Sequence, residues 1–279
     1  MAISIPVRDV LREKLLVQGW DEKTETFPGA TLNSANWTNT GGYPWDNGLE
    51  RDHVNWGNFD DVGSPRNKQE WCKPSQVVVS NGLTITAETM TTEQHERPAD
   101  ETLYDFDKTS GVIHSYNKWY WDPPFYAEAV WKINSDVGWD AVWFLQNDGS
   151  FPAHGEIDLG ENFGRGGDQI SFNLHTYTPG YTQYKGDVNR TALSSKLSDT
   201  WYADGYHKLS MYHDADGTMT FYVNDVPGHT ISGAHVPNDH TYYWLVCLQL
   251  GGKAAPDPDT GTYPLAMDVQ RLSVITPPA

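Results

Sequence analysis

The chain has 279 residues and a formal net charge of −18, with a sequence pI near 4.7. This charge disfavours nucleic acid and anionic membranes as partners and argues against sulfated polysaccharides, whereas neutral glycans do not respond to it. Aromatic residues make up 13% of the chain, including 12 Trp and 15 Tyr, and such rings serve as core or as platforms for sugars. A chain of this length can fold as one domain, and we expect a monomer.

The first 20 residues contain no continuous apolar stretch, so we do not expect a signal peptide there. No run of about 18 apolar residues occurs, so no membrane-spanning helix is predicted. Cys72 and Cys247 have no neighbouring Cys or His at metal-ligand spacing, which disfavours zinc. They form either a disulfide or two buried thiols. The charged residues that interrupt the first 20 residues, and so argue against a signal peptide, are Arg8, Asp9, Arg12, Glu13 and Lys14.

Short β-rich runs alternate with turn signals along the chain. Asn81-Gly82, Asp148-Gly149 and Asp216-Gly217 each lie between apolar stretches, as hairpin loops do. A weak helical pattern covers residues 7–17. The pattern predicts an all-β sandwich of two packed antiparallel sheets, with one concave face exposed as a cleft. The expected strands are residues 77–79, 83–87, 125–133, 141–145, 170–175, 207–212, 218–223 and 243–250.

Alternation within residues 170–175 predicts a polar face opposite an apolar one. Phe172 and Leu174 share one face, and Asn173 and His175 share the other. A neighbouring segment supplies tryptophans in the same alternating manner. This combination of polar groups and rings indicates a substrate groove.

Three acids, Glu156, Asp158 and Glu161, lie within six residues of a segment whose alternating apolar residues mark it as a strand. In a regular strand the first two acids share a face, but Glu161 points to the other side. One extra residue restores it to that face. We therefore predict a β-bulge at Leu159-Gly160.

With the bulge, the two glutamates are about four strand positions apart, or roughly 13 Å between Cα atoms. Convergence of the side chains brings their carboxyl groups to roughly 5.5–7 Å, which favours a retaining glycosidase over an inverting one. Asp158 between them should raise the pKa of at least one neighbouring carboxyl group. The alternative interpretation is a calcium-binding or simply solvated acidic strand.

The sequence resembles glycoside hydrolase family 16, in its laminarinase and agarase-like group, through the motif Glu156-Ile-Asp158-Leu-Gly-Glu161. Further segments that resemble the family follow in the same order, from about residue 19 to residue 275. The resemblance implies a single glycoside hydrolase domain at residues 19–279, after an N-terminal extension at residues 1–18. The similar segments are residues 67–71, 81–87, 110–115, 139–145, 223–225, 250–252 and 268–271.

The resemblance also implies a β-jelly roll and an endo-acting, retaining mechanism. In it Glu156 is the nucleophile, Glu161 is first the acid and then the base, and Asp158 tunes and orients the nucleophile. No cofactor is required for this chemistry. A structural calcium ion is possible, and Asp268 lies where an acidic ligand often occurs.

The substrate-binding residues implied by the resemblance are mostly aromatic. Trp139 and Trp143 line the donor subsites, and Asn67 and Trp71 flank them. His175 faces the cleft, although a single histidine is often structural. The chain departs from the family pattern at Val130, which replaces an arginine, and at Asp140, which replaces a proline.

The leading hypothesis is an endo-β-1,3-glucanase that acts on β-1,3 or mixed-linkage glucan. A red-algal galactan hydrolase of the agarase, porphyranase or carrageenase type is the alternative. A different class is a non-catalytic glycan-binding module or a transglycosylase. We expect the polysaccharide substrate, and so the protein, to be extracellular, with the chain either a domain of a longer secreted protein or a phage-associated enzyme.

Overall fold

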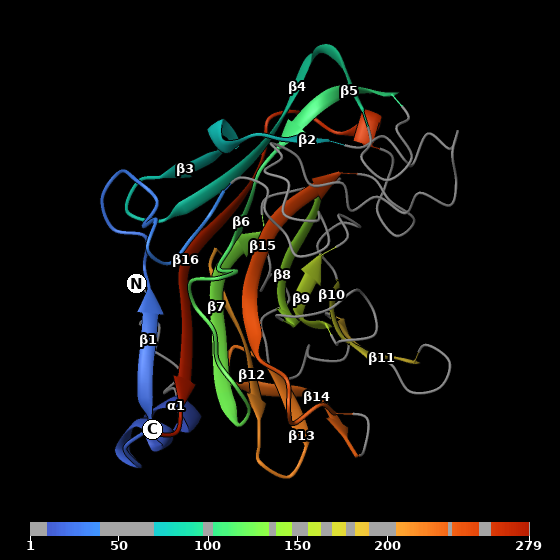
Figure 1. Cartoon of the computed structure of the whole chain (residues 1–279). Coiled ribbons are helices and arrows are strands. Elements are labelled where there is room, and N and C mark those ends of the chain that lie inside the picture. The colour runs from blue at the N-terminus through green and yellow to red at the C-terminus, as the bar shows by residue number, and fades with distance from the viewer. Residues whose placement is uncertain are drawn as a thin grey trace, which may run out of the picture.

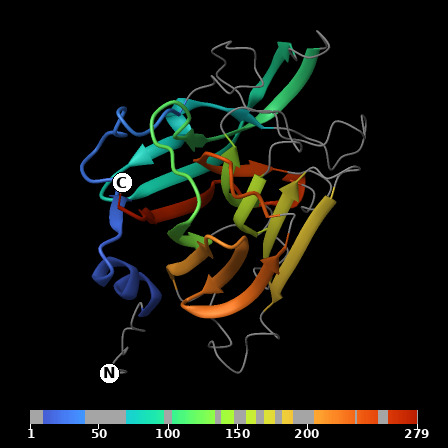
Figure 2. The same cartoon turned by 60° about the horizontal axis from the view of Figure 1, so that its bottom comes forward.

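A computed structural model describes residues 10–39, 70–96, 103–133, 138–146, 156–162, 169–176, 182–189, 205–233, 236–250 and 258–278. These residues form two stacked β-sheets, with β8 to β11 on one side of the molecule and β7 and β16 on the other (Figures 1 and 2). The strands around the centre pair antiparallel, and β2 with β5 is a parallel pair. The predicted β-sandwich is confirmed.

The outer sheet has ten strands. Its order is β14 (Val226–Ser232), β13 (Thr218–Val223), β12 (His207–His213), β7 (Phe125–Ile133), β16 (Leu265–Thr276), β4 (Leu83–Glu96), β5 (Leu103–Ser110) and β2 (Trp71–Cys72), with β1 (Asp21–Glu25) on β16 and β3 (Val77–Val79) on β4. Two short 3-10 helices, η4 (Pro74–Gln76) and η5 (Pro258–Thr260), lie between strands.

The inner sheet has six strands and carries the acidic segment near its middle. Its order is β11 (Thr182–Asn189), β10 (Gln169–Thr176), β9 (Glu156–Asn162), β8 (Gly138–Gln146), β15 (Tyr242–Leu250) and β6 (Val112–His114).

One apolar core fills the space between the sheets. Phe172 of the inner sheet stacks on Phe221 of the outer sheet, with ring centroids 5.0 Å apart. Leu174 belongs to the same buried cluster, so the predicted apolar face of residues 170–175 is the core face. Asn173 and His175 are left on the opposite face of the inner sheet.

The predicted turns at Asn81-Gly82 and Asp216-Gly217 are present. Asn81 and Gly82 have φ of 52° and 150°, and Gly217 has φ of 83°, a region that favours asparagine and glycine. The third predicted turn, Asp148-Gly149, lies outside the described residues.

The α-helix found among the described residues, α1 (Val10–Val17), packs on the outer sheet near β1 (Figure 1). Leu15 is buried there with Tyr126 and Ile275. Arg12 forms an ion pair with Glu22 at 2.6 Å. The helix therefore shares apolar and ionic contacts with β1, β7 and β16.

The position at which the family pattern expects an arginine is Val130 on β7. Arg271 of β16 pairs in register with Val130. Its Nη2 atom lies 2.6 Å from Oε1 of the buried Glu128, and the hydroxyl of Tyr126 donates to the other oxygen at 3.0 Å. The guanidinium group of Arg271, from the neighbouring strand, thus forms an ion pair with Glu128.

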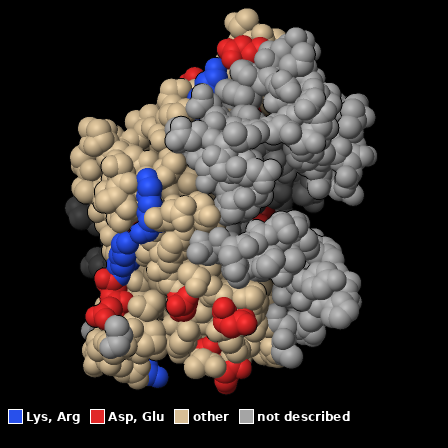
Figure 3. All heavy atoms as spheres, in the orientation of Figure 1, with Lys and Arg blue, Asp and Glu red and all other residues tan. Residues whose placement is uncertain are grey.

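Cys72 and Cys247 are both buried and do not form a disulfide. This outcome selects the two-thiol alternative over a disulfide. None of the helices in the described part of the chain is long and apolar enough to cross a membrane. On the face drawn in Figure 3, described basic side chains form a short run at the left and appear again near the top and the bottom edge, while most of the described acidic groups lie in the lower half.

Candidate active site

The bulge in β9 is present where the sequence predicts it. On the β8 side, Val142 pairs with Gly160 and the next residue, Trp143, pairs with Asp158. The register on the β10 side shifts at the same place. One residue of β9, Leu159, is therefore extra, and Glu161 returns to the face of Glu156 and Asp158.

Gly160 has a steric role at the bulge. A Cβ atom on this residue would lie 2.3 Å from Cδ1 of Leu209 and 3.3 Å from Cζ2 of Trp131, both in the outer sheet. Leu159 is fully buried in the same core. The bulge therefore directs two consecutive residues toward the interior, and there is space for only one side chain.

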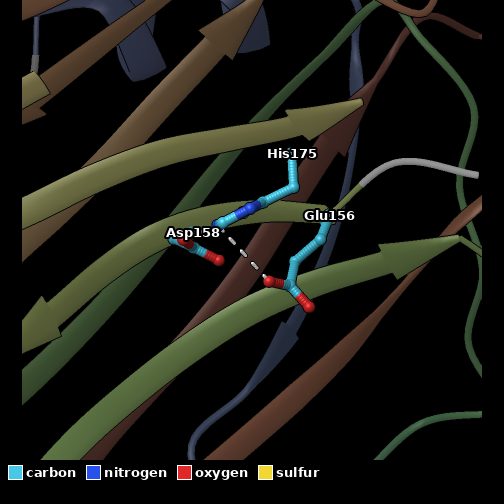
Figure 4. A group of neighbouring side chains, drawn as sticks. All are labelled: Glu156, Asp158 and His175. Carbon is cyan, nitrogen blue, oxygen red and sulfur yellow. Dashed lines mark hydrogen bonds and ion pairs between the residues drawn. The ribbon is translucent and has the colours of Figure 1, made fainter. Parts of the chain in front are cut away.

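Glu156, Asp158 and His175 converge on the opposite face (Figure 4). Nε2 of His175 lies 3.1 Å from Oδ2 of Asp158 and 3.7 Å from Oε1 of Glu156. The strands hold this arrangement, because Glu156 pairs with His175 across β9 and β10. Asp158 is 1% exposed and His175 is 8% exposed.

Burial, together with the charge of Asp158 and a side-chain hydrogen bond to it, raises the pKa of Glu156 to about 8. The positive charge of His175 opposes this shift. At neutral pH the Glu156 carboxyl group is therefore largely protonated.

Glu161 lies farther along the bulged strand and is 4% exposed. Its Oε2 atom accepts a hydrogen bond from Nδ2 of Asn173 at 2.6 Å. Three carboxyl groups thus lie along one strand, two of them coupled to a histidine and the third held by an amide.

A metal ion is another candidate for part of this face. The ligand atoms of Glu156, Asp158 and His175 lie within 4.8 Å of one another. Among the described residues, no other group of three such side chains brings its ligand atoms this close together. An ion held there would have two carboxyl groups and one imidazole as its ligands.

No family model matches the sequence. No curated protein matches it either. Solved structures do match over most of the chain. The catalytic domain of an endo-1,3-β-glucanase (laminarinase) from Thermotoga petrophila is 21% identical with a TM-score of 0.73, covering 93% of this chain and 99% of that one.

Two further structures extend the comparison. SCLam, a non-specific endo-β-1,3(4)-glucanase from family GH16, is 19% identical with a TM-score of 0.65 and covers 92% of each chain. A structure from work on endo-acting O-glycanases that human gut bacteria express to initiate mucin breakdown is 18% identical with a TM-score of 0.71, covering 92% of this chain and 91% of that chain.

The chain has the laminarinase fold. This likeness confirms the jelly roll predicted from the sequence. Within that fold, β9 and β10 are the strands that bring the three acids and His175 together.

The structure describes the predicted substrate-binding residues only in part. His175 lies beside the acids, as expected. Trp143 occupies the position opposite Asp158, and Trp139 the position opposite Gln249, whereas Trp71 lies on β2 opposite Thr109. The side chains of these tryptophans, and all of Asn67, lie outside the described residues. Their roles stay predictions.

Asp268, the residue at which the resemblance allows a calcium ligand, lies on β16 in the outer sheet, away from β9. Its Oδ1 atom accepts a hydrogen bond from the hydroxyl of Thr84 at 2.6 Å. Within the described residues, Asp268 does not belong to a group of three close metal-ligating side chains.

Sequence reasoning placed Asn173 on the groove face and missed its contact with Glu161. It also missed Tyr243, which lies on β15 in the register row of Leu145 and Glu156. The ring of Tyr243 packs against Tyr116 and Tyr120. Burial, those two phenols and Glu156 all raise the pKa of Tyr243. Alternation along β15 could have indicated this residue, because its neighbours Tyr242 and Trp244 face the core.

Proposed function

We propose that the chain is a retaining, endo-acting glycoside hydrolase of family 16 that cleaves β-1,3 or mixed-linkage glucan. The observation that carries the proposal is the bulge of β9, which places Glu156, Asp158 and Glu161 on one face with His175. Solved laminarinases of similar fold support the same substrate class.

In the first step, an ionised Glu156 attacks the anomeric carbon while Glu161 gives its proton to the departing glycosidic oxygen. The reactive form is the enzyme in which Glu156 has lost its proton, and Asp158 beside it orients the nucleophile. His175 lies 3.1 Å from Asp158 and 3.7 Å from Glu156, where its positive charge favours the ionised form of Glu156.

In the second step, Glu161 takes a proton from water, and the resulting nucleophile attacks the same carbon and releases Glu156. Two displacements at one carbon retain the anomeric configuration. The protein side chains supply every group in this scheme, so chelation with EDTA should leave turnover unchanged. Trp139 and Trp143 are proposed to line the donor side, with Asn67 and Trp71 flanking them.

We further propose that the enzyme acts as a monomer outside the cell, because its polymeric substrate is found there. A second substrate class enters the test because the mucin-related structure has a similar fold. Red-algal galactans remain the alternative substrate class.

The test is reducing-sugar release from laminarin, lichenan, agarose, carrageenan and mucin, with Glu156→Gln as the matched inactive control. We expect release from laminarin or lichenan, early products of several sugar units, and β-anomers first in the NMR spectrum. Activity on mucin or a galactan alone would replace the substrate assignment. Turnover that survives in Glu156→Gln would refute the nucleophile.

A further inference from the structure

Asn173 is a buried amide on β10 that points at Glu161. Its Nδ2 atom donates a hydrogen bond of 2.6 Å to Oε2 of Glu161, and the residue is 3% exposed. Such a bond to a carboxylate is short, which is typical of a charge-assisted contact.

The backbone fixes both partners. Asn173 pairs in register with Asp158, and Ser171 pairs with Glu161, with the bulge between the two pairs. The contact from Asn173 to Glu161 is therefore diagonal across two adjacent strands. Because each partner is anchored in a strand of the same sheet, the hydrogen bond restricts the orientation of the Glu161 carboxyl group.

The other polar atom of this side chain supports a role directed at Glu161. Oδ1 of Asn173 is buried and has no hydrogen-bond partner among the described residues. A side chain that served only to join strands would be expected to use both ends of its amide. Here the hydrogen bond to Glu161 is the one that the amide makes.

The two oxygens of Glu161 are consequently not equivalent. Oε2 accepts the hydrogen bond from Asn173, which fixes how this carboxyl group is turned. We propose that Asn173 is a positioning residue that holds the Glu161 carboxyl group in the orientation in which it gives a proton to the leaving group and later takes one from water. The inference rests on the proposed function and adds a residue outside the acidic motif.

The surroundings of Glu161 set which charges a pH measurement would report. Burial raises the pKa of the Cys247 thiol on β15. The nearby charges of Glu70 and Glu161 also raise this pKa. The titratable residues on the strands around Glu161 include Glu156 and Asp158 on β9, His175 on β10, and Tyr243 and Cys247 on β15. By register, Asp140 of β8 pairs with Asn162, and Lys185 and Asp187 of β11 pair with Asn173 and Ser171.

The first test compares aryl β-laminaribiosides whose phenols differ in acidity. A phenol of high pKa needs a proton from Glu161 to leave, whereas 2,4-dinitrophenol does not. In Asn173→Ala, kcat/KM should fall about 10- to 100-fold for the poor leaving groups and change less than about twofold for dinitrophenol. Equal losses for all leaving groups, or no loss, would overturn the inference.

Asn162→Ala is the matched control. It removes a buried amide one residue after Glu161, which alternation places on the other side of β9. Any loss in this variant should be the same for every leaving group, because a purely structural defect does not depend on the phenol. A leaving-group dependence equal to that of Asn173→Ala would count against a specific role for Asn173.

A second measurement does not require turnover. The titration of the Glu161 carboxyl carbon, followed by NMR, should move to higher pH by about 1 unit in Asn173→Asp, because a donor is replaced by a second negative charge. An unchanged titration would contradict the proposed coupling. If the wild type cleaves no glucan or aryl glucoside, the proposed function fails, while this titration still decides whether Asn173 governs Glu161.

Discussion

Leu159 and Glu161 are two residues apart on β9, yet they lie on opposite faces of the sheet. Leu159 is fully buried in the core between the sheets, whereas Glu161 accepts a hydrogen bond from Asn173 on the other face. Residues at this spacing share a face in a regular strand. The candidate site therefore depends on one extra residue in the backbone.

Gly160→Ala should disturb that backbone. The added Cβ would clash with Leu209, so we expect the free energy of unfolding to fall by about 1–3 kcal/mol and turnover to fall further as Glu161 is displaced. Denaturant unfolding and laminarin hydrolysis provide the two measurements. The control is the same substitution in a Leu209→Ala background, where the space has been vacated. A cost as large in that background as in the wild type would contradict the steric explanation.

Asp158→Asn should change the acidic limb of the pH profile. Asp158 contributes to the raised pKa of Glu156, so its removal should lower that pKa. Because Glu156 must be ionised to attack, the acidic limb of kcat/KM should move to lower pH, while the maximal rate falls because the carboxyl group that orients the nucleophile is lost. A full pH profile of wild type and variant measures both effects. An acidic limb that stays in place or moves upward would count against the coupling.

Two buried carboxyl groups should make stability depend on pH. Burial raises the pKa of Glu70 to about 8, and Glu156 has a similar value. The folded state holds these protons more tightly than the unfolded state, so their contribution is present below about pH 4.5 and is lost as pH rises toward 8.

Glu70→Gln isolates one of these contributions. Glutamine can still accept the hydrogen bond that Glu70 receives from the backbone N–H of Leu250 at 3.1 Å. Between pH 5 and 8 the decline in unfolding free energy should therefore flatten by up to about 1.4 kcal/mol per pH unit. Chemical denaturation at several pH values measures this slope. A slope identical to that of the wild type would show that Glu70 does not take part.

The sequence predicted the sandwich and the bulge because both follow from alternation. The core residues Phe172 and Leu174 and the acids on β9 supply a strong period-two signal. The acids Glu156, Asp158 and Glu161 can share one face only if the strand contains one extra residue. The bulge could therefore be predicted from the sequence alone.

Other elements were missed because their composition is polar. β1 reads Asp-Glu-Lys-Thr-Glu, and four of its five residues are exposed. β11 and the outer part of β4 also lack apolar alternation. These strands form through pairing with neighbours such as β16, and pairing partners far away in sequence are not visible from composition.

The contacts within the candidate site were only partly predictable. The position of His175 on the groove face followed from alternation, but its distance from Asp158 depends on the register of β9 and β10. The steric role of Gly160 depends on Leu209 in the other sheet. Likewise, the hydrogen bond from Asn173 to Glu161 exists because the bulge shifts the register between them.

The most direct test of the proposed mechanism is to trap the covalent intermediate. The enzyme would be treated with a 2-deoxy-2-fluoro-laminaribiosyl fluoride, digested and sequenced by mass spectrometry, with Glu156→Gln treated in parallel. The mechanism predicts one sugar label per chain, attached to Glu156 and absent from the variant. A label on Glu161 or Asp158, or an active wild type that never becomes labelled, would contradict it.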